Sequence, residues 1–262
     1  MITKLAVKNL CFGYHIAGIL KNLHLEVGDG QIVSIVGPNG SGKSTLIKCI
    51  DRILVPSSGN IIVDRRDLAK MSRLNMARMI AYVPQNSPRI FPNTVFDVVM
   101  MGRRPHLCWN GSHRDEEKVW EALRILNIEN LALNPFNELS GGQQQKVLIS
   151  RALAQETGVI LLDEPTSSLD LWHQIDVMEV LQSLVKKRNI AAVIAIHDLN
   201  AAARYSNRII MMNKGKIVAN GKPDAVINEE NLKTVYAIKA NVRIMDEIPY
   251  VIPLSRIVRS SA

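Results

Sequence analysis

The sequence is 262 residues long, 47% hydrophobic and 21% charged, with a formal net charge of +8. This length is enough to bury a substantial core, so we expect a globular chain that forms one domain or a domain with an insertion. No apolar run reaches the length of about eighteen residues that crossing a bilayer requires. Polar residues interrupt the N-terminus at Lys4, Lys8 and Asn9, which excludes a signal-peptide pattern and predicts a cytosolic protein.

Three cysteines, Cys11, Cys49 and Cys108, are isolated in the sequence. Their odd number and wide spacing predict neither a disulfide framework nor a metal site of the CxxC type, so we expect reduced thiols. The net charge of +8 indicates an acidic partner. A nucleotide, a nucleic acid and an anionic membrane surface all fit this charge, which alone does not choose among them.

Strand-like apolar runs alternate with helical patterns along most of the chain, which predicts an α/β fold with a mainly parallel sheet. The first clear unit is a strand over Ile32–Val36, followed by a glycine-rich loop and a helix over Lys43–Ile53. The loop fits G-x-x-x-x-G-K-[ST] at every position, and its flanking strand and helix favour this motif over an incidental glycine turn. We assign nucleotide binding to Gly37, Pro38, Asn39, Gly40, Ser41, Gly42, Lys43, Ser44 and Thr45.

The chemistry of this loop follows from its backbone. The backbone N–H groups would wrap the phosphates of a nucleotide, and the dipole of the following helix would add positive potential. Lys43 would reach the β- and γ-phosphate oxygens, and the Ser44 hydroxyl would bind Mg²⁺. We therefore expect ATP and Mg²⁺ as cofactors.

Polar side chains follow three further predicted strands at the point where each strand ends. Gln85 follows Met79–Val83, Asp163 and Glu164 follow Val159–Leu162, and His197 follows Ile190–Ile196. Ligands of open α/β sheets bind outside the carboxyl ends of the strands. Taken singly, Gln85 would be a solvated loop amide and His197 a hydrogen-bonded turn histidine. Their common placement instead predicts one site shared with the phosphate loop.

Each group in this site has a role that phosphoryl transfer needs. Asp163 would hold Mg²⁺ directly or through water, and Glu164 would orient and polarise the attacking water. Pro165 restricts the backbone that aims Glu164. His197 would hydrogen-bond the γ-phosphate, and Gln85 would contact Mg²⁺ or the water. We therefore predict Glu164, His197 and Gln85 as catalytic residues, and Ser44, Gln85 and Asp163 as metal ligands.

The strand pattern is interrupted between Phe91 and Ala154. Helices are predicted over 94–101, 114–126 and 141–154, with no strong strand between them. We expect a single domain in which residues 1–90 and 156–227 form the nucleotide-binding core and residues 91–155 form a helical subdomain. Residues 228–262 would be a short extension, with a helix to Ile238 and then an extended stretch in which Pro249 and Pro253 limit regular structure.

Within the helical subdomain, a Ser-Gly-Gly sequence stands at the start of the third helix. Ser140 is a good N-cap, and Gly141 and Gly142 allow a backbone to approach a ligand closely. The free N–H groups of such a helix start favour an anion. One nucleotide seldom needs two helix N-termini so far apart in one chain, so we expect this one to serve a nucleotide held by another copy.

The run Leu139, Ser140, Gly141, Gly142 and Gln143 is similar to the signature motif of the ATP-binding cassette (ABC) ATPases. The resemblance covers residues 2 to 222 and includes the phosphate loop, a glutamine loop, the Asp-Glu pair and a histidine switch in the family's order. It implies a P-loop NTPase (RecA-like) core with a mainly parallel sheet, an N-terminal antiparallel β part and an inserted α-helical subdomain. It also implies a head-to-tail homodimer, in which the signature of one copy closes over ATP held by the other.

Other positions fit the resemblance less uniformly. Ser168, Leu169 and Asp170 resemble the family's D-loop. Tyr14 matches the aromatic residue that stacks on adenine, although a packing role fits it nearly as well. Lys146 departs from the pattern because arginine is commoner there, which puts a contact near the signature helix in doubt.

Three functions use the same ATPase: a motor for a membrane transporter, an ATPase acting on nucleic acid, and a P-loop kinase. The kinase would need an arginine-rich lid and leaves the signature unexplained. A nucleic-acid function would be favoured by a long heptad insertion or a second cassette, and the sequence has neither. Its basic residues Arg65, Arg66, Arg103 and Arg104 are not interleaved with aromatic residues, so no nucleic acid is expected as a partner, and the nucleic-acid ATPase stays the alternative.

The segment from Thr94 to His106 resembles the cassette subunits of importers for iron chelates, haem and cobalamin, and residues 107–113 resemble the same subgroup. The resemblance implies a homodimer on the cytoplasmic face of the cell membrane, peripheral to it, that drives uptake through a separate permease. An extracytoplasmic solute-binding protein would be an indirect partner. Phe91 and Phe96 are predicted either to contact the permease or to pack inside the helical subdomain.

Overall fold

The computed structural model describes residues 2–14, 17–85, 93–106, 113–167 and 169–257. Its centre is a six-stranded sheet in which neighbouring strands are parallel, except for the antiparallel pair at one edge. In spatial order its strands are β10 (Lys216–Gly221), β9 (Arg208–Asn213), β3 (Ile32–Val36), β8 (Ala191–Ala195), β7 (Val159–Asp163) and β6 (Ile80–Val83). Every residue of β3, β7 and β8 is buried, as expected of central parallel strands covered on both faces.

A second, antiparallel sheet comes from the N-terminal part of the chain. In spatial order its strands are β2 (Ala17–Gly28), β1 (Thr3–Tyr14), β4 (Ser58–Val63) and β5 (Arg66–Asp67). This sheet and helix α1 (Lys43–Ile50) enclose one apolar core with one face of the central sheet. Val33 and Ile35 of β3 point into this core, whereas Ile32 and Val36 point into the core on the opposite face, which is the alternation expected of a strand.

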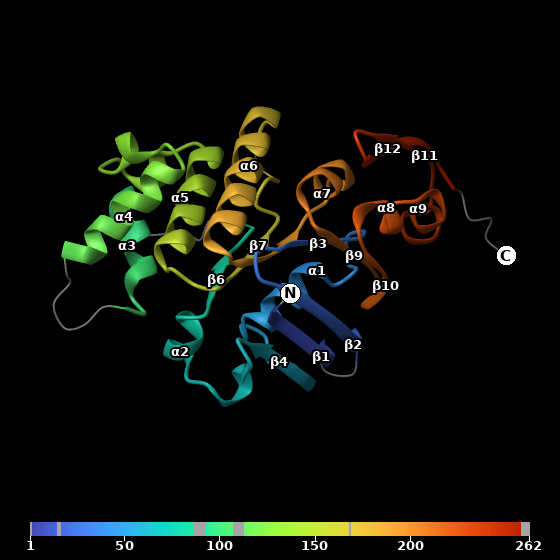
Figure 1. Cartoon of the computed structure of the whole chain (residues 1–262), viewed down its shortest axis with the longest axis horizontal. Coiled ribbons are helices and arrows are strands. Elements are labelled where there is room, and N and C mark those ends of the chain that lie inside the picture. Colours follow the sequence, from blue (N-terminus) through green and yellow to red (C-terminus); the bar gives the residue numbers. More distant parts are fainter. Residues whose placement is uncertain (1, 15–16, 86–92, 107–112, 168, 258–262) are drawn as a thin grey trace.

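Helices cover the opposite face of the central sheet. Their common feature is an apolar stripe that packs into the larger core; they are α5 (Gly141–Ala154), α6 (Leu171–Arg188) and α7 (Leu199–Tyr205). Figure 1 shows the central strands lying between these helices and the N-terminal antiparallel strands. The layers confirm the predicted α/β architecture, with a mainly parallel sheet and an antiparallel β part.

The predicted helical insertion lies between β6 and β7, at one end of the molecule (Figure 1). Its helices are α3 (Val95–Met100), α4 (His113–Ile125) and α5, with the short turns η2 (Met101–Arg103), η3 (Glu129–Leu131) and η4 (Phe136–Glu138). The observed helix ends differ from the predicted ones by a residue or so, because helix ends carry weaker sequence signals than helix interiors. Thr94 and Asp97 form a capping box at the start of α3.

The remaining short elements are η1 (Leu68–Lys70), α2 (Arg73–Ala77), α8 (Pro223–Val226) and α9 (Glu229–Tyr236), followed by β11 (Ile238–Met245) and β12 (Ile248–Arg256). The last two strands pair antiparallel, so the expectation that Pro249 and Pro253 limit regular structure is wrong. Both prolines lie inside β12. Because β12 pairs with β11 alone, it is an edge strand, and proline is tolerated where a backbone N–H would face outward.

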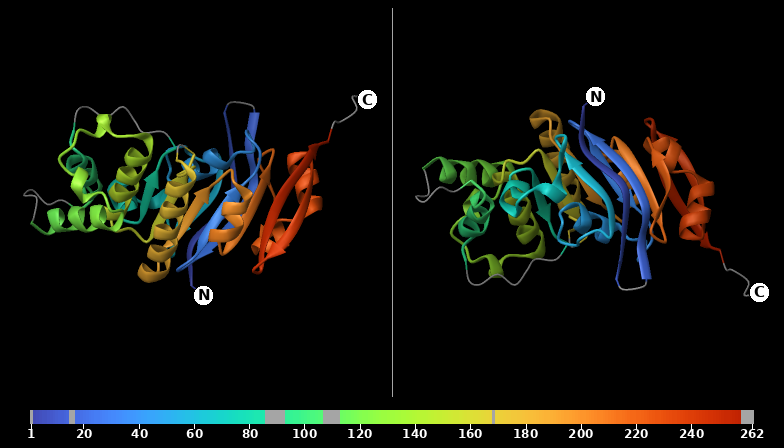
Figure 2. Two further views of the ribbon diagram at one scale, coloured as in Figure 1. Left: turned by 90° about the horizontal axis from the view of Figure 1, so that it is seen from above. Right: turned by 90° about the horizontal axis from the view of Figure 1, so that it is seen from below.

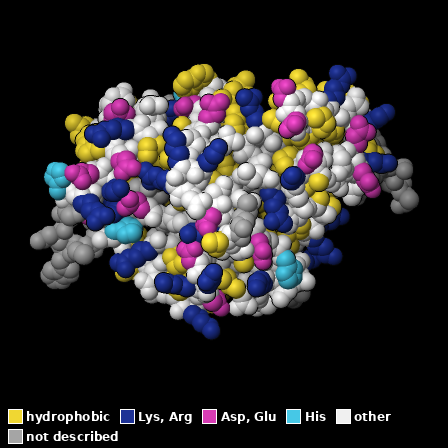
Figure 3. Space-filling view, in the orientation of Figure 1, with side chains coloured by type: hydrophobic (Ala, Val, Ile, Leu, Met, Phe, Trp, Pro, Cys, Tyr) yellow, Lys and Arg dark blue, Asp and Glu magenta, His cyan; other side chains and the backbone are white. Residues whose placement is uncertain are grey.

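Among the described residues, no helix combines the length and the apolarity that crossing a bilayer would require. On the face shown in Figure 3, Lys and Arg side chains are interspersed with Asp and Glu side chains. They do not gather there into one basic stripe. On this face the basic residues therefore form no track for nucleic acid. Arg103, which the sequence groups with the solvated basic residues, is instead 4% exposed and is paired with Asp115 and Glu156.

Candidate active site

The phosphate loop joins β3 to the N-terminus of α1. Gly37 has a φ of +152°, and a Cβ atom there would lie 2.3 Å from the Met212 carbonyl oxygen, so only glycine fits. Gly42 is the N-cap of α1 with a φ of +103° and makes no side-chain cap hydrogen bond. The first N–H groups of α1 are therefore directed at the loop without a capping side chain, which is the geometry that binds phosphate at helix N-termini.

Lys43 and Ser44 connect this loop to the neighbouring strand end. The Lys43 ammonium is 5% exposed and donates to the Gly37 carbonyl at 2.8 Å. Burial lowers the pKa of Lys43, and the carboxylates of Glu164 and Asp163 oppose that shift without cancelling it. The Ser44 hydroxyl donates to Asp163 Oδ1 at 2.8 Å. Two residues that lie far apart in the sequence thus meet at the carboxyl edge of the sheet, as predicted.

Glu164 is held between the two other predicted groups. Gln85 Nε2 donates to Glu164 Oε2 at 2.6 Å, and His197 Nε2 contacts Glu164 Oε1. Glu164 is 7% exposed, whereas the His197 side chain is 44% exposed. Both carboxylate oxygens are therefore oriented by a nitrogen, one from β6's end and one from β8's end. The structure confirms that the strand-end groups converge.

The backbone of Glu164 is a feature that the sequence did not predict. Its φ is +52°, in the left-handed region, although a residue before proline favours an extended backbone. The Glu164 N–H donates to the Ala195 carbonyl at 3.0 Å, and the Ser167 hydroxyl donates to the Glu164 carbonyl at 3.1 Å. These bonds hold the unfavourable conformation, which costs on the order of 1–3 kcal/mol and aims the side chain across the sheet edge.

Asp163 lies deeper than Glu164. It is 2% exposed, and burial raises its pKa against the hydrogen bond from Ser44, which would lower it. Tyr82 of β6 is a neighbour that the sequence analysis missed. Burial, the Asp163 carboxylate and a hydrogen bond to Asp163 raise the pKa of Tyr82, so its phenol stays a neutral donor. The alternation along β6 predicts which face carries Tyr82, but no local signal indicates its carboxylate partner.

A cavity of about 340 Å³ lies where these groups meet. The phosphate loop, the end of β6 and the ends of β7 and β8 line it, through Asn39, Gly40, Ser41, Gly42, Lys43, Ser44, Thr45, Gln85, Glu164 and His197. Of the predicted nucleotide-binding residues, those of the signature are not in the lining. One chain therefore brings together the phosphate loop and the strand-end groups, and it holds the signature elsewhere.

The signature forms the predicted helix start. The Ser140 hydroxyl accepts from the Gln143 N–H at 3.3 Å, and Gln143 Oε1 accepts from the Ser140 N–H at 3.0 Å, which is a capping box. Ser140 and Gly141 are exposed, whereas Leu139 anchors the turn with 9% exposure. Gly142 faces Leu169, since a Cβ atom on Gly142 would lie 3.2 Å from the Leu169 side chain. An exposed N-terminus of a 14-residue helix is thus available to a partner.

The structure describes some of the remaining predicted positions and not others. Tyr14 ends β1 opposite Ala17, but its side chain lies outside the described part of the chain. Phe91, Ser168 and the segment 107–112 also lie outside the described residues. Lys146 forms an ion pair with Asp176 at 2.6 Å, and its ammonium lies 5.7 Å from the centre of the Trp172 ring. This contact ties the signature helix α5 to α6.

The residues of the cavity fit a nucleotide and a magnesium ion. The Ser41 hydroxyl is buried and has no hydrogen-bond partner in the described part of the chain, which suits a site that a phosphate oxygen completes. Ser44, Asp163 and Gln85 offer hydroxyl, carboxylate and amide oxygens, the ligands that Mg²⁺ prefers. Within the described ranges, no group of three His, Cys, Asp or Glu side chains could hold a metal by itself. That agrees with a metal held partly by phosphates.

Residues 20–167 match the protein family described as ABC transporter. The chain belongs to the ATP-binding cassette family. Across the family such chains are the ATP-hydrolysing subunits of membrane transporters, and this chain is an ATPase of that kind. Transport and import ATP-binding subunits are among its relatives, and a dimeric cassette is among the similar solved structures.

Relatives of known name cover the whole cassette. An uncharacterized ABC transporter ATP-binding protein of Methanocaldococcus jannaschii is 46% identical over 95% of this chain and 98% of its own length. The ferric enterobactin transport ATP-binding protein of Escherichia coli (strain K12) is 36% identical over 100% of this chain and 98% of its own. The sequence resemblance to the importer cassettes is thereby confirmed at the level of the family, and the nucleic-acid alternative is not favoured.

Solved structures agree. A structure described as an inward-facing metal-chelate type ABC transporter has a TM-score of 0.84 and 32% identity, covering 97% of this chain and 98% of that one. A dimeric ATP-binding cassette in a post-hydrolysis state with ADP and Pi has a TM-score of 0.76 and 30% identity, covering 84% of this chain and 98% of that one. The predicted P-loop NTPase fold, with its antiparallel β part and its helical insertion, is confirmed.

Proposed function

We propose that this cassette is the motor of an importer for an iron complex, haem or cobalamin. It would act as a peripheral homodimer on the cytoplasmic face of the membrane, with a permease dimer and an extracytoplasmic binding protein. The observation that carries the proposal is the similarity to a ferric enterobactin transport subunit along 100% of the chain. The similarity to a metal-chelate type transporter and the segment from Thr94 to His106 support it.

The phosphate loop would bind ATP through its backbone N–H groups and through Lys43, whose pKa is lowered by burial and whose ammonium is compensated by nearby carboxylates only in part. The phosphates of the nucleotide would supply the missing negative charge. Ser44, Asp163 and Gln85 would hold Mg²⁺, which would neutralise charge on the transferred phosphoryl group. Gln85 gives its N–H to Glu164, so its carbonyl oxygen remains for the metal.

Glu164 would accept the proton of the attacking water and orient it. Its carboxylate is positioned before any substrate arrives, since Gln85 and His197 hold its two oxygens. Such preorganisation is what a general base needs, because a misplaced base loses much of its effect. The exposed His197 ring faces the same cavity and would donate to the γ-phosphate.

The second half of the site would come from another copy. The exposed start of α5 would supply the N–H groups of Gly141 and Gly142, which the Ser140–Gln143 capping box does not use, to a γ-phosphate. It is not part of the cavity of its own chain. In a head-to-tail dimer each signature would close over the nucleotide of its partner. ATP would therefore join the two copies, and hydrolysis would release them.

A groove between the nucleotide-binding core and the insertion is the surface that we assign to the permease. It has a volume of about 730 Å³ and lies between α1, α2 and β6 on one side and η2 and α5 on the other. Phe96, one predicted contact, packs against Trp120 with ring centres 5.4 Å apart, which supports the packing alternative for that residue. Met71, Met76 and Met101 give the groove adaptable apolar walls that suit a short helix from a permease.

The composite site is tested by Ser140→Arg on purified protein. A bulky cation at this N-cap should leave ATP binding to the monomer intact and abolish ATP-driven pairing, measured by light scattering. Ser72→Arg is the matched control, because Ser72 caps α2 by accepting from Asn75 at 3.3 Å and lies in a different helix. Normal pairing and turnover by the Ser140 variant would remove the signature from the site.

The import function is tested in cells. A strain that lacks this cassette should fail to take up at least one of a radiolabelled ferric siderophore, haem and cobalamin, and the wild-type gene should restore uptake where Glu164→Gln does not. Unchanged uptake of all three would contradict the proposal. Stimulation of the purified ATPase by DNA or RNA, with normal uptake, would favour the nucleic-acid alternative.

A further inference from the structure

We infer that the C-terminal hairpin β11–β12 positions His197, and that Asn200 is the residue that connects them. The inference rests on the catalytic role proposed for His197. It gives the C-terminal extension a part in hydrolysis, beyond the cassette motifs themselves. The hairpin lies at the opposite end of the molecule from the helical insertion, beside α7 (Figures 1 and 2).

Asn200 makes two hydrogen bonds to one residue of the hairpin. Its Oδ1 accepts from the Val251 N–H at 2.8 Å, and its Nδ2 donates to the Val251 carbonyl at 3.3 Å. The side-chain amide thus reproduces the paired donor and acceptor of a neighbouring strand. β12 has β11 on one edge only, so Asn200 satisfies backbone groups on the other edge.

Asn200 lies three positions after the histidine in the chain. His197 follows the end of β8 by two residues, Asp198 is the N-cap of α7, and Asn200 lies in the first turn of that helix. The Asp198 carboxylate accepts from the Asn200 N–H at 2.8 Å and from the Ala201 N–H at 3.1 Å. The helix start is therefore rigid, and any shift of α7 relative to the hairpin would move His197.

On its other side, among the described residues, His197 contacts Glu164 and is carried by the chain that follows β8. The Ile196 N–H donates to the Ile35 carbonyl at 3.1 Å, which fixes the residue before the histidine. The ring itself is 44% exposed and lies at the edge of a cavity of about 390 Å³. Tyr250 of the hairpin and Tyr205 of α7 are part of the same lining. The packing around His197 is thus open, and the position of α7 decides where the ring lies.

The hairpin is itself a firm support. Ala240 and Val251 are buried in the larger core together with Leu232 and Val235 of α9. The Ile257 N–H donates to the Ala237 carbonyl at 2.8 Å and closes the far end of the hairpin. Loss of the Asn200 side chain would consequently loosen the start of α7 against the hairpin, while Ala202 and Ala203 keep the rest of the helix in the core.

The test compares Asn200→Ala with Asn231→Ala in the full-length dimeric protein. Asn231 is also half-buried and donates to the Val226 carbonyl at 2.8 Å, but it lies in α9 and its amide bonds to Val226 and not to the hairpin. Asn200→Ala should lower kcat by about 10-fold, because small displacements of a catalytic group cost that much, with the KM for ATP and the melting temperature nearly unchanged. Asn231→Ala should leave kcat unchanged. Asn200→Asp keeps the acceptor for Val251 and should recover part of the loss.

A second measurement separates this inference from the role of His197. If His197→Ala turns over normally, the proposed role of His197 is wrong. If His197→Ala is impaired and Asn200→Ala matches the wild type, the hairpin inference alone is overturned. The expected result is that Asn200→Ala adds less than about twofold on top of His197→Ala, since residues acting through one another are not additive. Full additivity, or a loss in Asn200→Ala that tracks the melting temperature alone, would also overturn it.

Discussion

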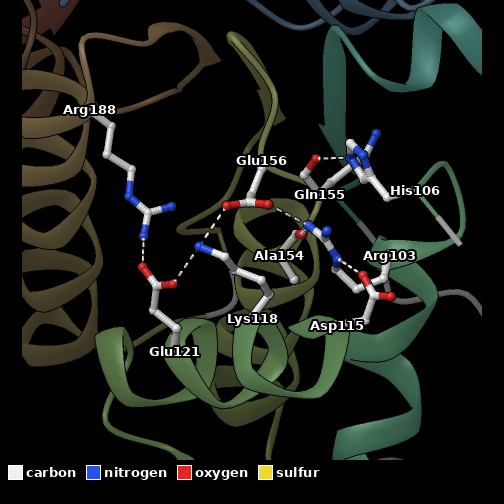
Figure 4. A network of polar contacts seen from close by, with 9 residues as sticks. All are labelled: Arg103, His106, Asp115, Lys118, Glu121, Ala154, Gln155, Glu156 and Arg188. Atoms are coloured by element: carbon white, nitrogen blue, oxygen red, sulfur yellow. Dashed lines mark hydrogen bonds and ion pairs between the residues drawn. The ribbon is translucent and has the colours of Figure 1, made fainter. Parts of the chain in front are cut away.

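Two regions of this cassette concentrate charged side chains, and they handle the charges in opposite ways. At the catalytic edge, burial lowers the pKa of Lys43 and raises the pKa of Asp163, in each case against neighbouring groups of the chain. At the junction of the insertion with the nucleotide-binding core (Figure 4), the pKa of Lys118 is raised and the pKa of Glu156 is lowered. The hydrogen bonds that Lys118 donates to Glu156 and Glu121 raise its pKa. Burial would raise the pKa of Glu156, but Lys118 and Arg103 outweigh it and lower it.

At the junction, charged side chains form a network in which few lack a partner of opposite charge. Arg103 of η2 binds Asp115 of α4 at 2.9 Å and Glu156 at 2.8 Å, and Lys118 of α4 binds Glu156 at 2.8 Å. Arg188 of α6 closes the network through Glu121. The network stabilises the insertion against the core. At the catalytic edge, burial instead disfavours the charged forms of Lys43 and Asp163, and a nucleotide and a metal ion would compensate these charges. At the catalytic edge burial sets the direction of the pKa shifts of Lys43 and Asp163, whereas at the junction the paired side chains set those of Lys118 and Glu156.

The largest expected effect is that of Glu164→Gln. It should lower kcat by about 1,000-fold, because the proposed general base is lost while the shape of the site is kept. ATP binding should persist, and an ATP-bound dimer should accumulate. Turnover measures the first effect and size-exclusion chromatography the second. Glu156→Gln makes the same chemical change in the network and is the control, with kcat within about twofold of the wild type. A Glu164→Gln enzyme that hydrolyses ATP at the normal rate would remove Glu164 from its role.

Arg103→Met should destabilise the fold by about 3 kcal/mol, because it takes the guanidinium from two carboxylates, one of them in Asp115 with a 9% exposed side chain. Urea denaturation measures this loss. The kcat of the folded fraction should stay near the wild-type value. The adjacent Arg104→Met, a change at an exposed position, is the matched control and should cost less than about 0.5 kcal/mol. Equal stability of the two variants would show that the network does not contribute to the free energy of unfolding.

Asp51 tests the effect of burial without a charged partner, because burial alone raises its pKa from 3.8 to about 7. The folded state then binds this proton more tightly than the unfolded chain, so stability falls as the pH rises from about 4 to about 7. Asp51→Asn should remove that loss and stabilise the protein at pH 8 by on the order of 2 kcal/mol, with little effect at pH 4. Denaturation curves across this range measure it, with Asp224→Asn at an exposed site of α8 as the control. A pH-independent difference would contradict the assignment.

Glu121→Gln should have the smallest effect. Its side chain is 44% exposed and lies at the outer end of the network, between Lys118 and Arg188. Exposed ion pairs are worth roughly 0.5 kcal/mol and are screened by salt. The melting temperature should change by a degree or two at low ionic strength and converge with that of the wild type at about 1 M salt. A loss as large as that of Arg103→Met would mean that the whole network acts as one unit.

The sequence predicted the parts of the site whose signals are local. The phosphate loop is a continuous motif, and Gln85, Asp163, Glu164 and His197 each follow an apolar run that ends abruptly. Parallel strands bring such ends together whatever the loops between them are. The Ser140 cap was predicted for the same reason, because the residues of a capping box lie within a few positions of one another in the sequence.

The missed features depend on contacts between distant segments. Hydrogen bonds to Ala195 and Ser167 impose the left-handed φ of Glu164. The pattern of apolar runs in the sequence carries no information about them. The hairpin containing Pro249 was missed because proline argues against a central strand and says little about an edge strand. Its contact with Asn200 joins residues 51 positions apart and has no sequence pattern.

The division of the site between a phosphate loop and an exposed signature has a consequence for genetics. If each site takes its loop from one copy and its signature from the other, Lys43→Ala and Ser140→Arg are inactive for different reasons. Combined in one cell, the two variants form mixed dimers in which both defects fall on one site and the other site is wild type throughout. Two null alleles of a single gene should therefore complement each other in part, whereas either allele paired with itself should not.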